Sequence, residues 1–134
     1  MELSGGCLCG TVRYACSGEF LRQAICHCRD CQRWSGSAFH VGVIVPRSDF
    51  TLLSGELRTY RTTGESGRWI DRSFCPAGGS GLLHVLEVRG PDIVVIKAGT
   101  LDDPGVVVPN YEIFSRSKLP WVSIDADTEK PDVV

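Results

Sequence analysis

The chain has 134 residues, 43% of them apolar, which is enough for one domain with a real core and too few for two full domains. Its 14 basic and 16 acidic residues give a net charge of −2, which argues against a general nucleic-acid binder. The longest apolar runs, such as residues 41–45 and 93–96, fall far short of the ~20 residues that a membrane span needs, and the N-terminus lacks the features of a signal peptide. We therefore expect a soluble, cytoplasmic protein with no membrane or nucleic-acid partner.

Short runs rich in Val, Ile, Thr, Tyr and Phe recur along the chain and are separated by Gly and Pro. Several of them alternate with a period of two, which is typical of β-strands. We predict a mainly β domain over residues 1–124, with strands at residues 11–15, 39–45, 57–61, 68–74, 82–88 and 93–98. One short helix is expected at residues 29–35. Residues 46–49 and 102–105 are expected to be turns, although the polar segment 99–104 is also a candidate functional loop. The acidic segment 125–134 is predicted to be a frayed tail.

The seven cysteines are the main chemical signal of the sequence. In a reducing compartment, clustered thiols favour metal binding over disulfides. The motif Cys26-His-Cys-Arg-Asp-Cys31 places three thiols within a few residues, close enough to converge on one zinc ion. Cys26, Cys28 and Cys31 are therefore predicted to bind metal. The spacing leaves open whether this site is a catalytic one with an open position, a closed site completed by a distant cysteine, or a redox pair.

A second, sparser set of thiols combines Cys7 and Cys9 with the distant Cys75. Such pairs from separate segments are how zinc ribbons tie strands together. The usual partner of Cys75, three residues further on, is replaced by Gly78, so the set is one thiol short. Cys16 is interpreted as a small buried hydrophobe.

Other polar and aromatic residues have two possible interpretations each. His27 is either a ligand or acid–base group, or a side chain that points away from the metal loop. His40 and His84 lie on predicted strands and are interpreted mainly as partly buried strand residues. Arg29 and Arg33 have an electrostatic reason to lie beside a thiolate-rich ion. Separately, the tryptophans are expected in the core or in a cleft: Trp34, Trp69 and Trp121.

The motifs taken together resemble the glutathione-dependent formaldehyde-activating enzyme family, which includes centromere protein V-like proteins. The resemblance covers nearly the whole chain, in the order and spacing of the family. It is carried by GGCLCGTVRY at residues 5–14, CHCRDCQRWSGSAF at 26–39, VP at 45–46, RSFC at 72–75, GTLDDP at 99–104 and SKLPW at 117–121. The resemblance implies an Mss4-like fold of several coiled antiparallel β-sheets with zinc-binding cysteine loops.

The resemblance also implies roles for the cysteines. Cys26, Cys28 and Cys31 match the ligands of the family's catalytic zinc, while Cys7, Cys9 and Cys75 match three of the four ligands of its structural zinc. The fourth structural ligand falls on Gly78. We therefore expect the second site to be weak or empty, needing water or a group such as His84 to complete it. Glu112 is a second departure, because many members carry His there.

The reaction implied by the resemblance joins glutathione to formaldehyde. Zinc held by three thiolates is a poor Lewis acid but still deprotonates a substrate thiol, so it favours a nucleophilic sulfur. The sequence thus predicts a zinc-dependent carbon–sulfur lyase or synthase that takes a small glutathione-like thiol and a small aldehyde. Arg29 and Arg33 would offset the negative charge, and Arg72 or Lys118 would hold a substrate carboxylate. The alternatives are a non-catalytic zinc-stabilised binding module and a thiol–disulfide or sulfoxide reductase.

Overall fold

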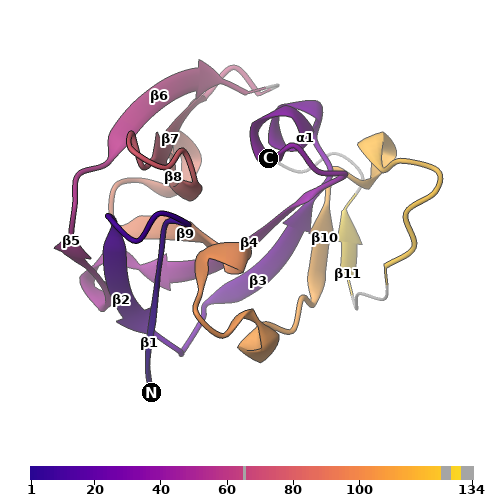
Figure 1. Ribbon diagram of the computed structural model, residues 1–134. Helices are drawn as coiled ribbons and strands as arrows, with labels where there is room; N and C mark the ends of the chain where they lie inside the picture. Colours follow the sequence, from indigo (N-terminus) through magenta and orange to yellow (C-terminus); the bar gives the residue numbers. More distant parts are fainter. Residues whose placement is uncertain (65, 125–127, 131–134) are drawn as a thin grey trace.

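The computed structural model describes residues 1–64, 66–124 and 128–130, and within them the chain is mainly β-structure with one α-helix. Figure 1 shows the elements in chain order. The strands and the helix are β1 Glu2–Gly6, β2 Arg13–Ser17, β3 Arg22–Cys26, α1 Arg29–Ser35, β4 His40–Pro46, β5 Phe50–Ser54, β6 Arg58–Thr63, β7 Trp69–Phe74, β8 Gly81–Leu86, β9 Ile93–Lys97, β10 Tyr111–Ile113 and β11 Thr128–Lys130. Short 3-10 turns lie at Arg47–Asp49, Glu87–Arg89, Ala98–Thr100, Pro104–Val106 and Ser115–Ser117.

The strands form two sheets. The small sheet has the order β1-β2-β5, and the large one has the order β11-β10-β3-β4-β9-β8-β7-β6. Most neighbours are antiparallel, as expected for the predicted fold class, but β10 runs parallel to both β3 and β11. Such a parallel pairing needs a long connection between its strands, and here more than 80 residues separate β3 from β10.

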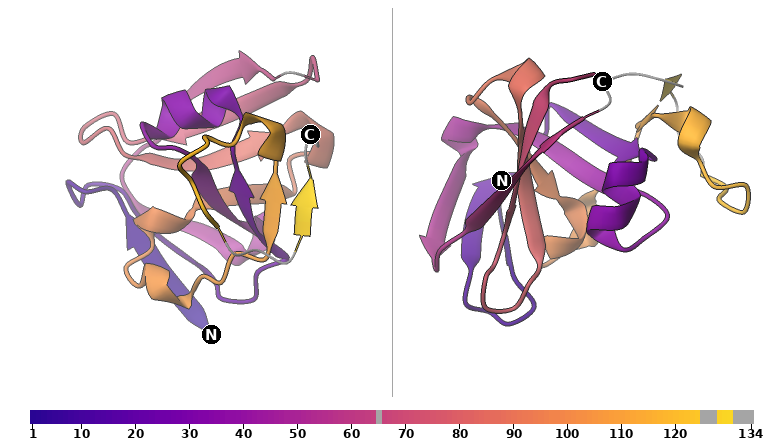
Figure 2. Two further views of the ribbon diagram at one scale, coloured as in Figure 1. Left: turned by 90° about the vertical axis from the view of Figure 1, so that its right-hand side faces the viewer. Right: turned by 90° about the horizontal axis from the view of Figure 1, so that it is seen from above.

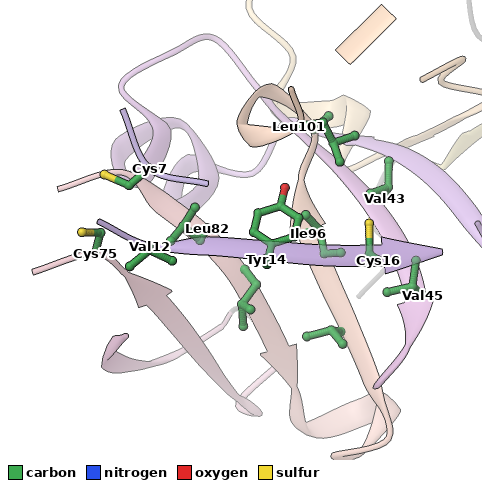
Figure 3. Close-up of a cluster of buried hydrophobic side chains, with 13 residues drawn as sticks. Cys7, Val12, Tyr14, Cys16, Val43, Val45, Cys75, Leu82, Ile96 and Leu101 are labelled. Carbon is green, nitrogen blue, oxygen red and sulfur yellow. The ribbon is translucent and has the colours of Figure 1, made fainter. Parts of the chain in front are cut away.

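The core fills the space between the two sheets. In Figure 3, Cys16 of β2 lies beside Val43 and Val45 of β4. Val12, just before β2, lies beside Cys75 at the other end of the cluster, and Tyr14 lies between the two ends. All of these are at most 2% exposed, and burial of this kind is the main stabilising term of the fold. The Tyr14 hydroxyl remains satisfied because it pairs with Thr100 Oγ1 at 2.7 Å.

Helix α1 lies between the two ends of the strongly curved large sheet (Figure 1), and Figure 2 shows it from two further sides. The helix begins at a cysteine: Cys28 is its N-cap, and the Cys28 sulfur accepts the backbone N–H of Cys31. It ends at Gly36, whose φ of 66° is the left-handed conformation that glycine adopts readily. The fold therefore fixes the cysteine motif at a strand-to-helix junction.

The structure confirms the predicted helix at residues 29–35 and the mainly β character. Each of the six expected strands has a counterpart, shifted by at most two residues at either end. The strands β1, β3, β5, β10 and β11 were not expected, because they are only three to five residues long and show no clear alternation of apolar and polar residues. Residues 128–130, predicted to belong to a frayed tail, form β11 and pair with β10. Of the predicted acidic tail, only residues 128–130 belong to the described part of the chain. No helix in that part is long and apolar enough to cross a membrane.

Candidate functional site

The three cysteines of the Cys26–Cys31 motif converge at the junction of β3 and α1. Cys26 is the last residue of β3, Cys28 caps the helix and Cys31 lies in its first turn. Their sulfur atoms all lie within 4.8 Å of one another, and the Cys31 N–H points to the Cys28 sulfur at 3.2 Å. This convergence fits a tetrahedral zinc ion, whose thiolate ligands lie about 2.3 Å from the metal. The three residues form what we call the first cysteine group.

In the first cysteine group, one of the three thiols loses its proton readily. Hydrogen bonds from Cys26 and Cys28 and the nearby Arg72 guanidinium lower the pKa of Cys31 to about 3, although burial opposes this. The pKa of Cys26 is raised, because its thiol is engaged with Cys28 and Cys31 and is buried. A thiolate is the form in which cysteine binds metal, so the group is predisposed toward a cation.

His27 lies between two of these cysteines but points away from them. Its ring is fully buried, and its Nε2–H donates to Glu112 Oε1 at 2.6 Å, while Lys118 Nζ lies 2.8 Å from the same oxygen. The Gln32 amide donates to the backbone oxygens of His27 and Ser117. His27 is therefore not a ligand of the first cysteine group. It holds the segment between β3 and α1 from the side away from the sulfurs. Glu112, which departs from the family pattern, is its partner.

A cavity of about 150 Å³ opens in front of the first cysteine group. Apolar side chains such as Ile70, Val95 and Phe114 form much of its wall. The polar side chains facing it next to the cysteines are His40, Arg72 and His84. A small molecule in this cavity would therefore touch the sulfur cluster and the buried polar groups together.

Arg72 and His84 lie opposite each other on the paired strands β7 and β8. Both are almost fully buried, at 2% and 4% exposed. Arg72 Nη1 donates to His84 Nε2 at 3.3 Å, and Arg72 Nε donates to Thr62 Oγ1 at 3.3 Å. Because His84 Nε2 accepts, its ring is neutral, and burial together with the nearby His40 and Arg72 holds its pKa well below the usual range. The Arg72 guanidinium is therefore a positive charge held in place beside Cys31.

Aromatic rings connect this arginine to a second buried cation. The rings of His40 and His84 stack at 4.6 Å, and Trp34 of α1 lies 4.8 Å from His84. Lys97 Nζ lies 4.2 Å from the Trp34 ring centre and Arg72 Cζ lies 5.5 Å from it. Burial lowers the pKa of Lys97 to about 8, against the opposing effect of the cysteines. Two cations thus lie beside the thiols, where they would offset the negative charge of thiolates.

The arginines singled out from the sequence occupy different places. Arg29 lines the cavity and its guanidinium bonds Gln32. Arg33 is exposed and lies along a separate surface groove with Phe39 and Trp121. Lys118 forms an ion pair with Glu112, on the side of the β3–α1 segment away from the sulfurs. Of the basic residues considered for the site, Arg72 is therefore the one that the fold brings against the cysteines.

The second cysteine group consists of Cys7, Cys9 and Cys75. Their sulfurs also lie within 4.8 Å of one another, and the Cys9 and Cys75 sulfurs are 3.8 Å apart. Cys7 and Cys75 belong to the main core, and Figure 3 shows their side chains close together at one end of it. Burial raises the pKa of Cys7, but hydrogen bonds from Ser80 and Cys9 outweigh it and bring the pKa to about 6. This group too can hold a metal ion.

Gly78 lies where a fourth ligand of the second cysteine group would stand. A Cβ atom added to it would lie 2.6 Å from the Cys7 sulfur and 2.7 Å from the Cys9 sulfur. Its backbone does not have the left-handed conformation that favours glycine, whereas the neighbouring Gly79 does, with a φ of 83°. His84 does not complete this group, because it faces the cavity beside the first one. The Cys7 and Cys9 sulfurs therefore lie in the space that a side chain at Gly78 would need.

Sequence reasoning missed His40, His84 and Lys97 as members of the first site. One signal was present: His84 interrupts the apolar run LLHVL of β8, and its cross-strand partner Arg72 is equally out of place on a buried strand. Buried ionisable residues on paired strands are unusual unless they serve a site.

Comparison with known proteins agrees with this geometry. A family profile described as "Glutathione-dependent formaldehyde-activating enzyme" matches residues 2–117. A solved structure, the crystal structure of a Rhodobacter sphaeroides protein from structural genomics, is similar in fold, with a TM-score of 0.59 and 21% identity over 75% of this chain and 88% of that one. Because the family match spans most of the chain, this protein belongs to the glutathione-dependent formaldehyde-activating enzyme family.

Proposed function

We propose that this protein is a zinc-dependent carbon–sulfur lyase or synthase. It joins a small glutathione-like thiol to formaldehyde or another small aldehyde and catalyses the reverse cleavage. The observation that carries this proposal is the position of the first cysteine group on the wall of a closed-in cavity that also holds Arg72.

The donors fit a zinc ion. Cys26, Cys28 and Cys31 supply three soft sulfur ligands, which is the number typical of catalytic zinc sites, and they face the cavity. A zinc ion bound there would supply a position for the substrate sulfur and lower the pKa of that thiol. The protein residues then balance the charge, because Arg72 and Lys97 are buried cations close to the sulfurs.

The rim of the cavity favours a negatively charged thiol. Four further arginines line it, against the two acidic residues Asp30 and Glu87: Arg22, Arg29, Arg68 and Arg89. Arg22 is held over the Tyr111 ring at 4.1 Å, which limits its freedom. A thiol with carboxylates, such as glutathione, matches this charge.

A non-catalytic binding module is the competing function. It predicts a fourth protein ligand on the first cysteine group. Within residues 1–64, 66–124 and 128–130, that group comprises three sulfurs without a fourth His, Asp, Glu or Cys donor. The enzyme therefore remains the better supported function.

The test is an exchange measurement. Zinc-loaded protein is mixed with glutathione and ¹³C-formaldehyde, and the rate of interconversion between free aldehyde and hydroxymethyl adduct is followed by exchange NMR. We expect a rate well above the uncatalysed one, and a return to the uncatalysed rate in Cys31→Ser. Wild-type protein that binds zinc and leaves the rate unchanged would support the binding module.

A further inference from the structure

Arg72 has one end of its guanidinium held and the other end without a partner. Nε is bonded to Thr62 and Nη1 to His84, and the guanidinium also acts on the Cys31 sulfur, whose pKa it lowers. Nη2, although buried, has no hydrogen-bond partner among the described residues. Leaving a buried N–H of a charged group without a partner is energetically costly, and such exceptions often mark sites where a ligand binds. Arg72 lines the cavity beside the cysteines, so the missing partner can come from a molecule in the cavity.

His40 presents a second unpartnered atom in the same cavity. Its ring is 5% exposed, and its Nε2 is also without a hydrogen-bond partner in the described part of the chain. His40 is the cross-strand neighbour of Cys26, and its ring stacks on His84, which holds Arg72. Two buried polar groups therefore face the space next to the sulfurs, whose remaining wall is mostly apolar.

We propose that Arg72 is a catalytic residue that binds the aldehyde oxygen, with His84 and Thr62 as its positioning residues. This inference rests on the proposed function and deepens it. The site would take a small carbonyl compound whose oxygen becomes negatively charged beside the sulfur. Arg72 is therefore assigned to the reacting centre, in place of the carboxylate anchor that its charge alone suggests.

The chemical step balances without a further reagent. The substrate thiolate attacks the carbonyl carbon, a carbon–sulfur bond forms, and the electron pair of the C=O π bond moves to oxygen. The Arg72 Nη2–H donates to this developing oxyanion. The oxygen then takes up a proton from solvent, which replaces the one that the thiol lost on binding, so that thiol plus aldehyde gives the hydroxymethyl thioether. Removing one such donor typically lowers a rate by 10²–10³-fold.

The experiment compares Arg72→Gln with two thiols. Glutathione carries carboxylates and 2-mercaptoethanol has none, and the exchange NMR rate is measured for both with ¹³C-formaldehyde. We expect Arg72→Gln to lower both rates about 100-fold, while the thiol-induced rise in melting temperature changes little. Arg58→Gln is the matched control: it removes the same charge from an exposed position on β6 and leaves both rates unchanged.

The other outcomes overturn the assignment. A loss confined to glutathione would make Arg72 a carboxylate anchor. Equal losses in rate and in thiol binding would mean that it only supports the metal–thiolate cluster. Unchanged rates in Arg72→Gln would remove it from the reaction. A wild-type protein inactive with both thiols would overturn the proposed function itself, and this inference with it.

Two further measurements do not depend on turnover or on the Gln variant folding. Arg72→Lys keeps the positive charge beside Cys31 but cannot reach three partners, so we expect an intermediate loss, about tenfold for both thiols. Formate is a stable oxyanion probe, and its binding is followed by the change in tryptophan fluorescence, because Trp34 lies beside Arg72 and Trp69 lines the cavity. We expect formate to bind wild-type protein and Arg58→Gln, and to bind the Arg72 variants at least tenfold more weakly. Equal formate binding in all of them would contradict the proposal.

Discussion

The two cysteine groups have the same number of thiols and different surroundings. The first is built from residues 26–31 at one strand-to-helix junction, and it faces a cavity with Arg72. The second joins Cys9 to Cys75 across 66 residues, and two of its members are part of the main core. Three sulfurs close together therefore do not define a role. A cavity and buried cations beside the sulfurs favour chemistry, whereas core packing across distant segments favours a structural tie.

Cys31→Ser gives the largest expected effect. The first group would keep only two thiolates, so we expect the protein to lose about one zinc per chain and its thiol–aldehyde activity. The fold should survive, because His27 and Glu112 hold the loop from behind. Elemental analysis measures the bound zinc, and circular dichroism measures the fold. Cys16→Ser is the control, because Cys16 is buried and belongs to neither cysteine group, so that variant should keep its zinc. Unfolding of the Cys31 variant would instead indicate a structural site.

Gly78→Cys tests the second group. Its Cβ would crowd the Cys7 and Cys9 sulfurs, so without metal we expect a loss of about 1–3 kcal/mol from overpacking. With zinc, a fourth thiolate should more than offset this, giving about one additional bound zinc and a higher melting temperature.

Gly79→Cys is the matched control for that variant. It adds a thiol one residue away, where a Cβ meets nothing within 4 Å but the φ of 83° disfavours a side chain. This variant should lose about 1 kcal/mol and gain no zinc. If wild-type protein already binds two full equivalents of zinc, the second group does not need a fourth thiolate.

Glutathione should distinguish the two groups by binding only at the first. A ligand at a hundredfold excess over its dissociation constant stabilises the folded state by about 2.7 kcal/mol. We expect this shift in thermal unfolding of the zinc form and of Cys75→Ser, and no shift in Cys31→Ser. Equal shifts in both cysteine variants would place the thiol elsewhere.

Glu112→Gln weakens the contacts that hold the segment of the first cysteine group and leaves the second group unchanged. We expect a loss of about 2 kcal/mol, because Gln keeps an acceptor but not the charge. Burial raises the pKa of Glu112, but hydrogen bonds from Lys118 and His27 outweigh it and hold the pKa below its usual value.

The pH dependence follows from that direction. Since the folded-state pKa is lowered, the stabilisation by Glu112 is present at neutral pH and is lost as the pH falls through the folded-state value, below about 4.5. The difference in unfolding free energy between wild type and Glu112→Gln, measured by urea titration, should therefore shrink in acid. A difference that is constant with pH would mean that the carboxylate charge contributes nothing.

Sequence patterns predicted the features that are formed by residues close together in the chain. The helix at residues 29–35 and the first cysteine group follow from spacing alone, because a strand end and a helix start bring those thiols together. The second group was proposed only by analogy with zinc ribbons, and the family resemblance then supported it, since no local rule pairs Cys9 with Cys75. The Arg72–His84 pair depends on strand register, and the Glu112–His27 contact depends on the parallel strand β10. Register and crossover topology are set by tertiary packing, which single residues do not reveal.

The difference in sequence separation has a consequence for biosynthesis. All three thiols of the first group leave the ribosome almost together and can capture a metal ion at once. Cys75 is synthesised 66 residues after Cys9, and at a synthesis rate of roughly 5–20 residues per second this delay is on the order of 3–13 s. During that time two thiols of a nascent chain are open to oxidation. The second cysteine group therefore closes later in synthesis than the first, and its two early thiols are unpaired for longer.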